Sequence, residues 1–357
     1  MRKANHVSAE IVLHAVKGEI LPDGAWYRYG ELYRVNLDKA EISKCRGGKL
    51  YLNDCLSSMV ISGHAIYVLG GGGVRHSKKG IDGLFTSEQH LHSRASFIDL
   101  DNTDGGWKPL PDFKSRIVRP VCVSFQGNLF VFGGMCKRGN GTPTVSPGEE
   151  INPRRNGNAR WSFLPDPPEQ AFNVSRPVLV DNKNNRILVH FKDSCSLYAY
   201  YPHQSKWEFL LHFAWHKTLA LFGDMLFFHA GCTFHAFDLA TKTQLHPIIS
   251  TDFPPCLLWT KFDVLITLAQ PGSFCLALDR GPILPDKTCL KFVKFCIERP
   301  CSGQPHIIFD SCCDLDVDGR ASVASFVPIV TRSSPKKDTS AKASETGVLI
   351  PSDTISI

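Results

Sequence analysis

Two stretches of the sequence share a pattern that restricts the fold more than any other feature. The first reads SSMVISGHAIYVLGGGG (57–73), and the second reads RPVCVSFQGNLFVFGGM (119–135). Each contains an apolar run, a short turn with glycine, and a second apolar run that ends at paired glycines. Two short apolar runs separated by such a turn are typical of a β-hairpin.

Further copies of this hairpin follow along the chain. The stretch SRPVLVDNKNNRILVHF (175–191) aligns with the second hairpin, because the triplet Arg-Pro-Val recurs at 119–121 and 176–178. Two weaker copies are centred near Met225 and Val264. A Trp-x-x-Leu frame follows three of the hairpins, at Trp107, Trp161 and Trp207. A repeat of about 40 to 50 residues with four strands predicts the blades of a β-propeller.

With these features the chain resembles the kelch-repeat family. The residues that carry the resemblance are Gly70, Gly71, Gly133, Gly134, Trp107, Trp161 and Trp207. The resemblance implies a closed, all-β propeller with four antiparallel strands per blade. It extends over about 55–211 and, in weaker copies, over 212–280. We expect five or six blades, with WYRYGELYRVNL (26–37) as the outer half of another blade and 306–330 as one more hairpin that completes it.

The same pattern divides the chain into three parts. We expect a lead-in over 1–25, the propeller over 26–330, and a disordered tail over 331–357, which is rich in Ser, Thr and Lys. The paired glycines should lie where the backbone approaches the central channel too closely for a Cβ atom. The tryptophans should pack at blade edges, because large aromatic side chains are mostly buried.

Composition bears on the compartment and on the partners. The chain holds 13 cysteines, an odd number, and begins MRKANHVSAE without an apolar leader, so we expect reduced thiols in the cytoplasm or nucleus. An uninterrupted run of about 18 apolar residues, as a membrane span requires, is absent from the sequence. The formal net charge of +6 is spread over 357 residues, which does not indicate nucleic-acid binding.

Basic residues concentrate in loops that a propeller would bring to one face. In a four-stranded blade, the connection between the second and third strands shares a face with the link to the next blade. We therefore expect both long insertions, 73–94 and 136–160, on the face that also carries the links. The predicted partner-binding residues are Arg75, Lys78, Lys79, Arg94, Arg116, Arg119, Lys137, Arg138 and Arg176. Arg154, Arg155 and Arg160 would join them, opposed by the fewer acids Asp82, Glu88, Glu149 and Glu150.

This face suggests a function in protein binding. Arginine forks pair well with carboxylates, and the resemblance implies that arginines near inter-blade links, here Arg116, Arg119 and Arg176, bind acidic peptides. The expected function is a non-enzymatic scaffold or substrate-recognition subunit. Only about 25 residues precede the first strand-like segment, too few for an F-box or BTB module, so any link to a ubiquitin ligase would come from another chain. The sequence does not indicate an oligomeric state.

A kelch-type enzyme or metal-dependent specifier is the alternative. Its support is weak, because the specifier iron pattern Glu-x-x-x-Asp-x-x-x-His reads Glu19, Asp23 and Tyr27 here. DLDVDG (314–319) resembles a calcium loop, but Ser325 stands where glutamate is needed, so we interpret it as a hairpin turn. The cysteine and histidine spacings match no common zinc site. We therefore expect no cofactor, no metal and no catalytic residues.

The first prediction concerns secondary structure. Circular dichroism of the purified chain should show a β-dominated spectrum, because the hairpin repeat leaves little sequence for helices. A helix content above about one third would contradict the propeller, since that is an ordinary value for mixed globular proteins.

Overall fold

The chain is an all-β protein in the computed structural model. The structure describes residues 9–20, 26–46, 57–76, 87–91, 94–137, 143–145, 148–154, 159–169, 173–212, 219–230, 233–249, 252, 262–268, 270–284, 287–299, 304–318 and 321–329. Within these ranges the only helical segments are two 3-10 turns, η1 (Thr103–Gly105) and η2 (Pro202–Gln204). The predicted all-β class is therefore confirmed, whereas the predicted tail at 331–357 lies outside the described residues.

The described residues form six blades, each a four-stranded antiparallel sheet with strands a to d from the centre outward. Blade 1 consists of β30 (Ala321–Ile329), β1 (Glu10–Ile20), β2 (Trp26–Asn36) and β3 (Glu41–Lys44). Blade 2 consists of β4 (Ser58–Ser62), β5 (Ala65–Leu69), β8 (Ala95–Asp99) and β9 (Lys108–Leu110). Blade 3 consists of β11 (Val121–Phe125), β12 (Asn128–Phe132), β15 (Glu149–Ile151) and β16 (Ser162–Phe163).

The second half of the chain supplies the other three blades. Blade 4 consists of β17 (Leu179–Asp181), β18 (Arg186–Phe191), β19 (Ser196–Tyr201) and β20 (Lys206–His212). Blade 5 consists of β21 (Leu219–Phe222), β22 (Met225–Ala230), β23 (Thr233–Asp238) and β24 (Thr243–Leu245). Blade 6 consists of β26 (Phe262–Thr267), β27 (Ser273–Leu284), β28 (Lys287–Glu298) and β29 (His306–Asp318), with β25 (Ile248–Ile249) parallel to β29 as a fifth strand.

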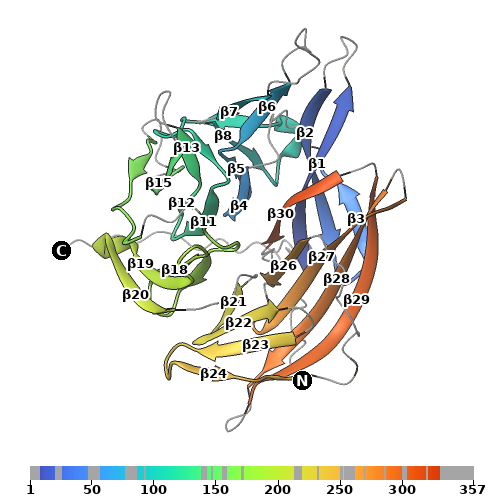
Figure 1. Ribbon diagram of the computed structural model, residues 1–357. Helices are drawn as coiled ribbons and strands as arrows, with labels where there is room; N and C mark the ends of the chain where they lie inside the picture. The colour runs from blue at the N-terminus through green and yellow to red at the C-terminus, as the bar shows by residue number, and fades with distance from the viewer. Residues whose placement is uncertain are drawn as a thin grey trace, which may run out of the picture.

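The innermost strands form a closed ring. They follow one another in the order β30, β4, β11, β17, β21 and β26, and β26 contacts β30 again. Figure 1 shows β4, β11, β21, β26 and β30 near the centre, with the outer strands around them. The described part of the chain therefore has six blades, which agrees with the predicted five or six.

Both ends of the described chain lie in blade 1. Strand β30 pairs antiparallel with β1, from Glu10↔Ile329 to Lys17↔Ala321. Two expectations are thereby corrected. Residues 10–20 are strand b of the propeller and not part of a lead-in, and 306–330 is not a hairpin, because β29 is strand d of blade 6 and β30 is strand a of blade 1. Residues 314–318 of the acidic stretch that resembled a calcium loop lie in β29, so the interpretation of this stretch as a hairpin turn was wrong.

The two long insertions carry small sheets of their own. Within blade 2, β6 (Gly72–His76) pairs with β7 (Ser87–Leu91), and within blade 3, β13 (Met135–Lys137) pairs with both β10 (Ile117–Val118) and β14 (Pro143–Val145). The prediction that 136–160 is one b–c loop was wrong. Residues 149–151 are strand c, so 152–161 is a c–d connection on the opposite face.

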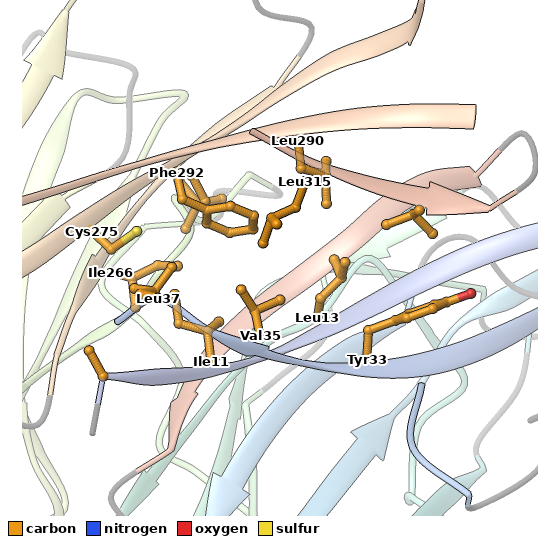
Figure 2. Packing of buried hydrophobic residues seen from close by; sticks show 14 of the residues in the cluster. Ile11, Leu13, Tyr33, Val35, Leu37, Ile266, Cys275, Leu290, Phe292 and Leu315 are labelled. Carbon is orange, nitrogen blue, oxygen red and sulfur yellow. The ribbon is translucent and has the colours of Figure 1, made fainter. Parts of the chain in front are cut away.

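Apolar side chains between neighbouring blades form the core. Successive residues of a strand point to opposite sheet faces, so each blade presents an apolar surface to both neighbours. Figure 2 shows this packing between blades 1 and 6, where Ile11, Leu13 and Val35 meet Phe292 and Leu315. Blade 1 is therefore held at the ring closure in two ways. Strand β30 is hydrogen-bonded to β1 within the blade, and this buried cluster packs blade 1 against blade 6.

The paired glycines have a more specific role than predicted. Gly70 and Gly71 have φ angles of 66° and 122°, which disfavour other residues. A Cβ atom on Gly70 would lie 2.9 Å from Pro120 Cγ and 3.0 Å from the carbonyl oxygen of Ile117. The close neighbour is therefore the link that enters blade 3 and not the central channel.

Two of the repeated tryptophans tie consecutive blades together. The indole N–H of Trp161 donates to the Pro111 carbonyl at 2.8 Å, and that of Trp207 donates to the Pro165 carbonyl at 3.1 Å. Each proline follows strand d of the preceding blade. Trp107 packs at the edge of the cluster between blades 1 and 2.

A buried ionic network lies in the outer strands of blade 1. Glu31, which is 3% exposed, accepts hydrogen bonds from Lys44 and from the Tyr33 hydroxyl, and its Oε2 lies 2.9 Å from Lys17 Nζ. Burial alone would raise the pKa of Glu31, but the hydrogen bonds from Lys44, Tyr33 and Lys17 outweigh it and lower the pKa to about 2. The network joins β1, β2 and β3.

We predict that the blade 1–blade 6 interface dominates stability. Phe292 is 1% exposed there, so Phe292→Ala should lower the free energy of unfolding by about 3–5 kcal/mol. Phe163, which is 49% exposed on β16, is the matched control, and Phe163→Ala should cost less than about 1 kcal/mol. Urea denaturation measures both. Equal effects would contradict the assigned core.

The Glu31 network predicts acid sensitivity. Because the folded-state pKa is lowered from 4.5 to about 2, its contribution is fully present above pH 4.5 and is lost as the pH falls toward 2. Glu31→Gln should therefore cost about 3 kcal/mol at pH 7 and progressively less below pH 4.5. Denaturation at several pH values, with the exposed Glu41→Gln as control, tests this. A pH-independent difference would show that the carboxylate is not the cause.

Candidate functional site

The propeller has two faces with different connections. One, called here the link face, carries the b–c connections such as 70–94 and the links between blades such as 111–120. The other, called the turn face, carries the a–b turns such as 63–64 and the c–d connections such as 152–161. Of the predicted partner-binding residues, Arg94, Arg116, Arg119 and Arg176 lie in connections of the link face, whereas Arg154 and Arg160 belong to the turn face.

Three cations from separate segments come together on the link face. Arg119 lies in the link to blade 3, Arg176 lies in the link to blade 4, and Lys192 lies in the b–c turn of blade 4. Burial lowers the pKa of Arg176, and the charge of Arg119 lowers it further. Burial also lowers the pKa of Lys192, with a further contribution from the charge of Arg176. These mutual effects place the three charges close to one another.

Arg176 is held in place by the backbone of the neighbouring link. Its Nη2 donates to the Pro120 carbonyl at 3.0 Å, and the side chain is half-buried. Arg119 is exposed and has a φ of 57°, a left-handed conformation that is uncommon for arginine. The link backbone is thus shaped so that one arginine packs against it and the other projects from it.

Sequence reasoning missed Lys192. Its position in the b–c turn of blade 4, on the same face as the links, could have indicated it. The prediction considered only the two long insertions and the links on that face. Asp193 partly opposes the effect of Arg176 on the pKa of Lys192. Asp193 is also engaged elsewhere, since it accepts hydrogen bonds from the backbone and side-chain amides of Asn173.

The other predicted cations are placed to different degrees. Arg94 and Arg116 are exposed on the link face and form no ion pair with any residue that the structure describes. The backbones of Arg75 and Lys137 lie in β6 and β13. Lys78, Lys79 and Arg138 lie outside the described residues. The structure therefore brings Arg119 and Arg176 together, and a role of any of these cations in partner binding stays a prediction.

The acids expected to oppose these cations are partly relocated. Glu149 and Glu150 lie in β15 and not in a loop. Glu149 is fully buried, and its two carboxylate oxygens accept the backbone N–H groups of Lys114 and Ser115, each at 2.9 Å. Glu149 therefore anchors the link that carries Arg116 and Arg119.

A cavity of about 1010 Å³ follows the axis of the propeller. It is lined by inner strands, including β4, β11, β17 and β26, and its wall is largely apolar. Cys122 and Pro177 line it, and these residues lie near the half-buried Arg176. Burial raises the pKa of the Cys122 thiol to about 12, so this cysteine is not an activated nucleophile.

A serine–histidine pair in the described ranges has the hydrogen-bonded geometry of a catalytic dyad. The Ser175 hydroxyl lies 2.6 Å from His190 Nδ1, but these residues are 1% and 2% exposed, so a substrate does not reach them. Among the described residues, no group of three or more His, Cys, Asp or Glu side chains is arranged to hold a metal ion. No described helix is long and apolar enough to cross a membrane.

Comparisons with known proteins add no family assignment. The sequence matches no protein-family model, and no curated protein matches it significantly. The six-bladed propeller is accordingly the level of classification that the fold supports.

Proposed function

We propose that this chain is a kelch-type, non-enzymatic protein-binding module whose link face binds an acidic segment of another protein. β-Propellers commonly act as interaction scaffolds. The observation that carries the proposal is the gathering of Arg119, Arg176 and Lys192 from three segments of blades 2 to 4. Like charges held close together repel one another, and a bound carboxylate relieves that repulsion.

The chemistry of these groups supports an acidic peptide as the ligand. The guanidinium presents a planar fork of N–H donors that matches carboxylate oxygens. Arg176 is half-buried, so an ion pair formed there is screened less by solvent than one at a fully exposed residue. Arg94 and Arg116 extend the positive face around this centre. In the proposed role the chain is a scaffold or substrate-recognition subunit of the cytoplasm or nucleus.

The test uses side chains whose removal leaves the propeller intact. Arg176 is spared, because its guanidinium bonds to Pro120. The triple variant Arg116→Gln, Arg119→Gln, Lys192→Gln should bind a Glu- and Asp-rich peptide about tenfold or more weakly than the unmodified chain, because each partly exposed pair contributes on the order of 0–1 kcal/mol. Fluorescence anisotropy with the labelled peptide measures the affinity.

Two controls define the interpretation. A peptide with Gln and Asn in place of Glu and Asp should bind neither protein, and the variant Lys108→Gln, Lys206→Gln removes two exposed charges elsewhere and should bind normally. Thermal melting should be the same for all three proteins. Unchanged peptide affinity in a normally folded triple variant would show that the link-face cations are only a solvated surface.

A further inference from the structure

A second cavity, separate from the link-face cluster, lies against the outer strands of blade 3. It has a volume of about 1050 Å³ and is called here the blade 3 groove. Lys114, Arg154 and Arg160 line it together with the aromatic ring of Trp161. The cations come from two different connections, the link 111–120 and the c–d connection 152–161, so the fold and not the local sequence assembles them.

The three cations of the groove form no close ion pair with a described carboxylate, although the charge of Lys114 acts on the buried Glu149. Lys114, Arg154 and Arg160 are all exposed, and none forms an ion pair with the residues that the structure describes. Lys114 Nζ instead lies 4.7 Å from the centre of the Phe163 ring. This contact with the negative face of the ring keeps the ammonium group beside the groove.

One acidic residue, Glu150, also lines the groove. Burial raises the pKa of its carboxyl group, and a side-chain hydrogen bond from Ser162, which lines the groove as well, acts in the opposite direction. In the lining, the single carboxyl group of Glu150 stands against three cations. Its neighbour Glu149 is bonded to the backbone of Lys114 and Ser115. The groove accordingly has a positive balance.

The walls of the groove are held in position. The backbone N–H of Arg154 donates to Asn152 Oδ1 at 3.1 Å, and the Arg154 guanidinium lies over the a–b turn of blade 2, where a Cβ atom on Gly63 would collide with it. Trp161 is 3% exposed and donates to the Pro111 carbonyl, and its ring is tilted by 34° against that of Phe113, with the ring centroids 4.1 Å apart. Positions fixed before binding reduce the entropy lost when a ligand binds.

We propose that the blade 3 groove binds a small molecule that carries phosphate or carboxylate groups, with Lys114, Arg154 and Arg160 as the anion contacts. Arginine and lysine are the usual protein groups for both oxyanions. Ile151 and Trp161 supply an apolar floor for the body of the ligand, and the Asn152 and Ser162 side chains supply polar contacts. This site lies along the outer strands of blade 3, between the link 111–120 and the c–d connection 152–161, and does not depend on the function proposed for the link face.

Isothermal titration calorimetry with inorganic pyrophosphate and with citrate tests the site. The full chain carries Arg119→Gln and Lys192→Gln as a common background, so that binding at the link face does not contribute. We expect saturable binding that weakens as sodium chloride is added, because the contacts are exposed to solvent. A stronger response to pyrophosphate identifies a phosphate ligand, and a stronger response to citrate identifies a carboxylate ligand.

In the same background, Arg154→Gln with Arg160→Gln should weaken binding by about tenfold or more. The matched control, Lys108→Gln with Lys206→Gln, removes the same charge from exposed positions outside the groove and should leave the affinity unchanged. Thermal melting establishes that each protein is folded, and Arg160→Gln alone replaces the pair if Arg154→Gln lowers the melting temperature. Failure of both probes to bind, or an equal loss of affinity in the control, would overturn the proposal.

Discussion

The whole structure depends on closure of the ring at blade 1. Each described blade has an apolar surface on both sides, and such surfaces are stable only when a neighbour covers them. Strand β30 comes from the C-terminal part of the chain and completes blade 1 by pairing with β1. Without that strand, β1 would present an open edge. The buried cluster that joins Ile11 and Leu13 of β1 to Phe292 and Leu315 would then rest on an unpaired strand.

Ring closure does not determine the path of the links between blades. Buried polar contacts determine the path of the link between blades 2 and 3. Glu149 accepts two backbone N–H groups of the link between blades 2 and 3, and Trp161 donates to the carbonyl that begins the same link. Buried polar groups need such partners. These contacts set the course of residues 111–120, and that course places Lys114 beside the groove and Arg119 beside Arg176.

The two cationic sites differ in their electrostatics. On the link face, Arg176 and Lys192 are half-buried, and burial lowers their pKa values, with a smaller contribution from the neighbouring positive charges. In the blade 3 groove the three cations are exposed: Lys114 lies over the ring of Phe163, and Arg154 lies over the turn at Gly63. The link-face cluster therefore suits an anionic group of a large partner that excludes water, whereas the open groove suits a small, solvated anion.

The sequence by itself determined the class of the fold, because hairpin periodicity, turn glycines and the Trp-x-x-Leu frame are local signals. It also indicated that Arg116, Arg119 and Arg176 lie in links on one face. Only the tertiary structure decided which strand closes the ring, since β1 and β30 are separated by most of the chain and their pairing is not encoded in any local pattern. Strand c of blade 3 is three residues long, too short to show a period, so Arg154 and Arg160 were assigned to the wrong face. Lys192 escaped notice for a related reason: its importance arises from the charge of Arg176, which folding brings to it from another blade connection.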